Sequence, residues 1–154
     1  MGDKWDFRFI ELARHIAMWS KDPSTKVGCV VVGEDREIRS TGFNGFPRGI
    51  DDNAERLLDR EKKYPLICHA EENAIMHAAR IGVSLKNSTA YVTWPPCSRC
   101  ARSLIQAGVT EVIYPEDCTV PSRSCYRVAG FKSCLVRDRM NRHWEASGRH
   151  ACRK

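Results

Sequence analysis

The hydrophobic pattern of residues 5–114 predicts an alternation of helices and strands. Apolar residues at helical spacing predict an amphipathic helix over 5–21. A nearly continuous β-branched run predicts a buried strand over 27–32, and the turn that follows returns the chain as an antiparallel strand over 37–43. The later pattern predicts, in order, a charged surface helix over 51–63, a helix over 69–80, a strand over 90–94, a helix over 97–107 and a strand over 110–114.

This order of elements predicts the fold class. The chain twice passes from strand to helix to strand, which implies parallel strands with right-handed crossovers. The order α-β-β-α-β-α-β therefore predicts an α/β fold with three layers, α-β-α, in which a mixed sheet has helices on both faces. The 154 residues suit a single domain over 1–154. Residues 115–141 have no clear period, and 142–153 predict a last helix in this divergent tail.

The composition of the sequence limits the expected location and partners of the protein. The sequence has no run of 18 apolar residues and no signal-peptide pattern at its N-terminus, so we expect a cytoplasmic protein without a membrane partner. A net charge of +6 admits polyanionic partners, but aromatic residues are not interleaved regularly with the basic ones. Most of the eight cysteines are expected to be inert thiols; a second metal site at Cys118, Cys125 and Cys134 is disfavoured because no histidine lies between them.

The candidate chemistry lies at His69, Glu71, Cys97 and Cys100. Zinc binds imidazole nitrogen and thiolate sulfur in a tetrahedron, and three protein ligands with an open fourth position are typical of a catalytic site. His69, Cys97 and Cys100 supply these ligands at predicted helix N-termini, where unpaired N–H groups favour thiolate. Glu71 is expected to take a proton from the water at the zinc and pass one to the ring nitrogen beside the amine. The pattern His-x-Glu followed by Pro-Cys-x-x-Cys is typical of zinc deaminases of nucleobases.

Two alternative interpretations of these residues leave Glu71 without a role. The first is a structural zinc site with Cys68 as the fourth ligand, although neighbours on a helix point in different directions. The second is a redox pair formed by Cys97 and Cys100. A catalytic zinc explains all four residues.

Five blocks of the sequence resemble deoxycytidylate (dCMP) deaminases, most closely viral or bacterial members. The blocks are residues 25–32, 42–49, 68–75, 96–101 and 104–114. The resemblance implies a cytidine deaminase-like fold and hydrolytic deamination of dCMP to dUMP, with dCTP as a further possible substrate. It implies zinc on His69, Cys97 and Cys100, with Glu71 as the proton shuttle. In a viral protein the expected location becomes the host cytoplasm.

The same resemblance implies regulation and assembly. Family members are commonly homohexamers that dCTP activates and dTTP inhibits together with Mg²⁺. The residues expected to bind these effectors are Lys26, Gly28, Asn44, Gly45, Arg48, Gly49 and Arg80. Substrate contacts are expected at Asn44, at Ala70 and, if residues 143–147 align with the substrate loop of the family, at Trp144.

Two other functions compete with a nucleotide deaminase. A tRNA adenosine deaminase would suit the basic pI of about 9.0. A zinc-stabilised nucleic-acid-binding module without activity would suit the ligands but not Glu71. The loop over 44–49 favours the nucleotide enzyme, so nucleic acid is not the expected partner.

Overall fold

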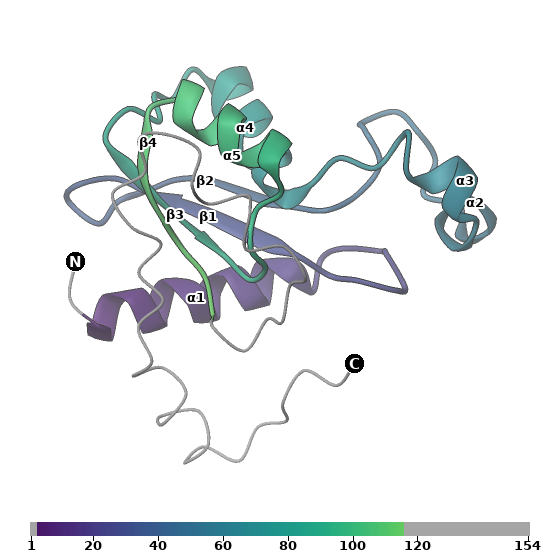
Figure 1. The fold of residues 1–154 in the computed structure, drawn as a ribbon, viewed down its shortest axis with the longest axis horizontal. Helices are drawn as coiled ribbons and strands as arrows, with labels where there is room; N and C mark the ends of the chain where they lie inside the picture. Colours follow the sequence, from purple (N-terminus) through teal and green to yellow (C-terminus); the bar gives the residue numbers. More distant parts are fainter. Residues whose placement is uncertain (1–2, 116–154) are drawn as a thin grey trace, which may run out of the picture.

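The computed structural model describes residues 3–115, which form a mixed four-stranded sheet between helices (Figure 1). One helix covers one face of the sheet and two cover the other, which confirms the predicted three-layer α/β fold. The strands are β1 (Gly28–Val32), β2 (Ile38–Phe43), β3 (Ser88–Val92) and β4 (Val109–Ile113), and the three covering helices are α1 (Asp3–Ala17), α4 (Ala70–Ile81) and α5 (Ser98–Gln106).

The strand directions agree with the predicted connections. The order across the sheet is β2-β1-β3-β4, in which β1 is antiparallel to both neighbours and β3 is parallel to β4. Because β1 opposes both β2 and β3, those two strands run the same way. The connections through α4 and through α5 therefore each join strands of the same direction, and both helices lie on one face of the sheet (Figure 1).

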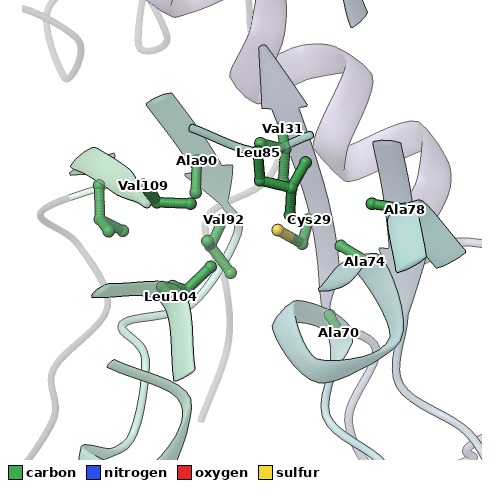
Figure 2. Packing of buried hydrophobic residues seen from close by; sticks show 11 residues of the cluster. Cys29, Val31, Ala70, Ala74, Ala78, Leu85, Ala90, Val92, Leu104 and Val109 are labelled. Atoms are coloured by element: carbon green, nitrogen blue, oxygen red, sulfur yellow. The ribbon is translucent and has the colours of Figure 1, made fainter. Parts of the chain in front are cut away.

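Alternate residues of β1 separate the two cores. Cys29 and Val31 belong to the core under α4 and α5, which Figure 2 shows, whereas Val30 and Val32 belong to the core over α1. All four side chains are fully buried. A strand covered on both faces has no polar face, which explains the continuous apolar run in the sequence.

Helix α4 packs unusually close to β2. A Cβ atom at position 42 would overlap the carbonyl oxygen of Ala70 and the backbone nitrogen of Ala74. The side chains that α4 presents to the core are small, and Ser40 Oγ donates a hydrogen bond of 2.6 Å to the carbonyl of Ala74. Glycine on the strand and alanine on the helix therefore fix the distance between these two elements.

Two polar side chains fasten the same helix to the same strand. Asn73 Nδ2 donates to the carbonyl of Phe43 at 2.7 Å, and His77 Nδ1 lies 3.3 Å from the carbonyl oxygen of Thr41. His77 is half-buried.

The predicted helix over 51–63 is wrong in two respects. It is divided into α2 (Ala54–Leu58) and α3 (Arg60–Lys63), because Asp59 takes an extended backbone and accepts hydrogen bonds from the N–H groups that open α3. The segment is also not wholly at the surface, since Leu57 and Lys63 are buried.

Two other elements have an end that differs by two or more residues from the prediction. The first helix ends at Ala17 because tight backbone turns follow it, and the third strand runs over 88–92, two residues earlier than predicted. None of the helices within residues 3–115 combines the length and the apolar character that crossing a bilayer requires.

The contact at Gly42 leads to a test of the fold. We expect Gly42→Ala to lower the free energy of unfolding by about 1–3 kcal/mol, because the new methyl group meets backbone that cannot move aside alone. Gly45→Ala is the matched control, since its Cβ would meet nothing closer than 4.0 Å. Urea denaturation of both variants measures the difference, and equal stabilities would contradict the packing described.

Candidate active site

The three predicted metal ligands meet where α4 and α5 begin. His69 is the N-cap of α4, Cys97 is the N-cap of α5, and Cys100 lies in the first turn of α5. The distance to His69 Nδ1 is 3.6 Å from Cys97 Sγ and 3.4 Å from Cys100 Sγ. An ion pair of 2.7 Å between Arg99 and Glu72 also links the two helix starts.

The spacing of these atoms fits a zinc ion. With Zn–S near 2.3 Å and Zn–N near 2.05 Å, tetrahedral geometry places a sulfur and a nitrogen ligand about 3.6 Å apart. All three ligand atoms lie within 4.8 Å of one another, and within residues 3–115 they are the one group of this kind. Cys68 does not belong to it, so the structure does not support a fourth protein ligand there.

The charges around the cluster affect the ligands in different ways. Burial, and then the charge of Arg99, lowers the pKa of His69 and so favours the neutral imidazole that binds metals. Burial, and then the charge of Glu71, raises the pKa of Cys100. Burial and Glu71 thus oppose the effect that we expect of the helix N-terminus, and a bound dication would favour the thiolate form of Cys100.

Glu71 lies beside the ligands with its carboxyl group almost completely buried. Its side chain is 3% exposed and is hydrogen-bonded to Cys100. Burial raises the pKa of the carboxyl group to about 7. A group with that pKa both accepts and gives a proton near neutral pH, which general acid–base catalysis requires.

The cluster opens into a pocket of about 340 Å³. His69, Glu71 and Cys97 line it together with apolar residues from several loops, and this volume is in the usual range for a small-molecule site. Trp94 also lines the pocket and is 37% exposed. The hydrophobic pattern did not indicate Trp94 as a pocket residue, although its place just before Pro95 and Pro96, which lead into Cys97, is a signal for it.

A second pocket residue that the sequence did not reveal is Lys63. It is 7% exposed, and its Nζ lies 2.6 Å from Asp22 Oδ2 and 2.7 Å from Ser24 Oγ. Burial alone would raise the pKa of Asp22, but hydrogen bonds from Lys63 and from Ser24 hold it below its ordinary value. Nothing in a charged run such as 60–63 distinguishes the buried lysine from the exposed ones.

Asn44 lines the pocket, and its side-chain amide makes three hydrogen bonds to neighbouring residues of the protein. Oδ1 accepts from the N–H of Val27 at 2.7 Å, while Nδ2 donates to Asp22 at 3.2 Å and to the carbonyl of Thr25 at 2.8 Å. Asn44 therefore holds the strand end and the turn that shape this wall. Ala70, the other predicted substrate contact of the described region, also lines the pocket.

The remaining predicted effector residues do not line this pocket. Lys26, Arg48, Gly49 and Arg80 are exposed, and Arg80 lies near the end of α4 opposite to His69. Gly28 is buried under α1, where a Cβ would overlap the carbonyl oxygen of Ala13. Gly45 pairs with Cys68 through two backbone hydrogen bonds. Trp144 and the cysteines at 118, 125 and 134 lie outside the described residues.

Metal content tests the ligand set directly. We expect the parent to retain one zinc per chain after dialysis and Cys97→Ala to lose it, because two remaining ligands bind zinc far more weakly than three. Cys68→Ala is the control, since that thiol lies next to His69 in sequence but outside the cluster. Elemental analysis measures the stoichiometry, and zinc loss in Cys68→Ala would reinstate the structural-site interpretation.

Comparisons with known proteins agree with this geometry. The profile of the cytidine and deoxycytidylate deaminase zinc-binding region matches residues 3–116. An uncharacterized deaminase of Aliivibrio fischeri is 46% identical over 117 residues, which cover 76% of each chain. The deoxycytidylate deaminase of Mus musculus is 38% identical over 140 residues, which cover 82% of this chain and 76% of the mouse protein.

A solved structure gives the same result. The dCMP deaminase of the cyanophage S-TIM5, in complex with dCMP and dUMP, superposes with a TM-score of 0.68 at 30% identity. The match covers 75% of this chain and 83% of the phage chain. A converged His/Cys/Cys cluster, a buried glutamate beside it and a profile match over most of the chain thus place this protein in the cytidine and deoxycytidylate deaminase family.

Proposed function

We propose that this protein catalyses the hydrolytic deamination of dCMP to dUMP, supplying dUMP for thymidylate synthesis. The observation that carries the proposal is the buried carboxyl group of Glu71, which lines a pocket of small-molecule size with the zinc ligands His69 and Cys97 and is hydrogen-bonded to the third ligand, Cys100. Support for the substrate comes from relatives that are named deoxycytidylate deaminases and from the phage enzyme bound to dCMP and dUMP.

His69, Cys97 and Cys100 would hold the zinc, which supplies a Lewis acid that activates water when it is bound. Glu71 accepts a proton from the attacking water and delivers it to the ring nitrogen next to C4. The oxygen of that water forms a bond with C4, and the C4–N bond breaks as Glu71 relays a second proton to the departing amine. The products are the uracil ring and ammonia.

The pocket walls would orient the substrate during these transfers. Ala70, at the start of α4, lies between His69 and Glu71 and is well placed to contact the base. Asn44 fixes the wall beside Val27, and its Oδ1 keeps one lone pair for the sugar. Excluding water from this pocket strengthens the electrostatic contacts inside it.

Ammonia release by the zinc-loaded protein tests the substrate. We would compare dCMP, dCTP, deoxycytidine and a tRNA anticodon stem-loop under the same conditions. Turnover of dCMP supports the proposal, whereas turnover of the stem-loop alone would favour the tRNA adenosine deaminase that the basic pI of about 9.0 also suits. Absence of turnover with all four would favour the non-enzymatic zinc module.

Glu71→Gln tests the proton shuttle. The amide keeps the shape of the side chain but cannot take up a proton, so we expect kcat to fall about 10²–10⁴-fold while zinc stays at one per chain. Glu72→Gln is the matched control, because the neighbouring carboxylate belongs to an ion pair with Arg99 and does not line the pocket. Steady-state kinetics and elemental analysis measure both effects. A Glu71→Gln variant as active as Glu72→Gln would show that the assignment is wrong.

The proposal extends to regulation by dCTP as activator and by dTTP with Mg²⁺ as inhibitor, in a cytoplasmic homohexamer, or in the host cytoplasm for a viral protein. Exposed cations at Lys26 and Arg48 are available to a triphosphate outside the pocket, with Gly49 beside Arg48 and Arg80 as a further candidate. Gly45, in the same loop, pairs with Cys68, the residue before the ligand His69. This pairing joins the loop to the backbone next to a metal ligand.

Arg48→Ala tests the effector assignment. We expect dTTP with Mg²⁺ to inhibit this variant less than the parent, each measured against its own turnover without effector, because the loop loses a cation for the triphosphate. Arg56→Ala is the control, since Arg56 is an exposed arginine on α2 outside this loop. Inhibition curves of dCMP turnover measure the difference, and identical curves for Arg48→Ala and the parent would remove Arg48 from the effector site.

A further inference from the structure

One buried cation in the pocket wall has no role in the proton transfers. Among the residues that line the pocket, all of them in the described part of the chain, Lys63 is the one lysine or arginine. It ends α3, an element separate from the two helices that hold the metal ligands (Figure 1). Asp22, Thr25 and Tyr64 line the pocket with it.

The contacts of Lys63 leave part of its ammonium group available to the pocket. An ammonium has three N–H donors. Within residues 3–115, Nζ contacts Asp22 Oδ2 at 2.6 Å and Ser24 Oγ at 2.7 Å, which uses two of them. The third donor is free for a group inside the cavity.

The carboxylate of Asp22 accepts several hydrogen bonds besides the one from Lys63. Ser24 donates to Oδ1 through its backbone N–H at 2.9 Å and through its hydroxyl at 2.7 Å. Asn44 Nδ2 donates to Oδ2 at 3.2 Å. The carboxylate is 2% exposed on its side chain, and its contact with Nζ orients the ammonium.

A purely structural ion pair is a poorer explanation. Removing two charges from water costs free energy that their attraction only partly offsets, and apolar residues of similar volume often stabilise a fold as well or better. A structural pair would also gain nothing from lying at a cavity wall. An oriented ammonium in the wall of this pocket is suited to bind an anion.

We propose that Lys63 binds the 5′-phosphate of the substrate, that Asp22 and Ser24 position its ammonium for this contact, and that the site thereby selects nucleotides over nucleosides. This inference rests on the proposed function. Glu71, Val27 and Asn44 line the same pocket as Lys63 and Thr25, so one ligand in this pocket can contact both Glu71 and Lys63. Binding the phosphate of a substrate with Lys is a common use of this side chain as a point charge.

The experiment compares kcat/KM for dCMP and for deoxycytidine in the zinc-loaded full chain. We expect Lys63→Gln to lower the ratio of the two values about tenfold to a hundredfold, mainly through the KM of dCMP, which is the range for one charge-assisted hydrogen bond. Lys62→Gln is the matched control, because Lys62 is the adjacent lysine, is exposed and pairs with Glu55 and Asp59 outside the pocket. It should keep the parent's ratio.

A second variant separates binding from folding. Lys63→Gln leaves Asp22 buried without its cation, whereas Asp22→Asn/Lys63→Gln removes both charges and restores a neutral wall. If Lys63 binds phosphate, the double variant is stable and still has the lowered ratio. If Lys63 is only structural, the double variant recovers the parent's ratio, and this result would overturn the inference.

Two further readouts separate this inference from the proposed function. Calorimetry of dUMP and deoxyuridine binding measures the phosphate contact without turnover. We expect the parent to bind dUMP more tightly than deoxyuridine, and Lys63→Gln to lose most of this difference in affinity. A parent that deaminates neither dCMP nor deoxycytidine would refute the proposed function. If the parent prefers dCMP over deoxycytidine and Lys63→Gln has the same preference, the proposed function is supported but the role of Lys63 is refuted.

Discussion

The close approach of α4 to β2 at Gly42 is the constraint on which the site depends. The helix begins with His69 and Glu71, so the distance between its backbone and the strand sets the position of one metal ligand and of the catalytic carboxyl group. Ser40 and Asn73 prevent the helix from sliding along the strand. A site held by packed backbone keeps the precision that proton transfer needs.

The pocket has anionic side chains at the metal ligands and a cation at another wall. Around the metal ligands, burial raises the pKa values of Glu71 and Cys100, and the charge of Glu71 raises the pKa of Cys100 further. A cation is therefore the group that this end of the pocket requires. At another wall the protein itself supplies a cation, Lys63, and holds it with Asp22. The end of the pocket with the metal ligands would thus bind the reacting base of a nucleotide, and the wall with Lys63 would bind its anionic group.

The sequence contained enough information for the layers and the ligand set. The continuous run of β1 predicts burial on both faces, and the spacing of Cys97 and Cys100 predicts one helix start, because both signals are local. The break at Asp59 was missed because an aspartate in a charged segment serves equally well inside a helix or as its cap. The burial of Lys63 and the raised pKa of Cys100 depend on residues distant in sequence, which no local pattern encodes.

The placement of the ligands on two helices has a consequence for folding. His69 and Cys97 stand 28 residues apart, with the whole of β3 between them. An ion bound to both therefore closes a long loop and restricts the unfolded chain as a crosslink would. Zinc would thus connect the second half of the domain to the first, and its release would loosen the sheet as well as stop the chemistry.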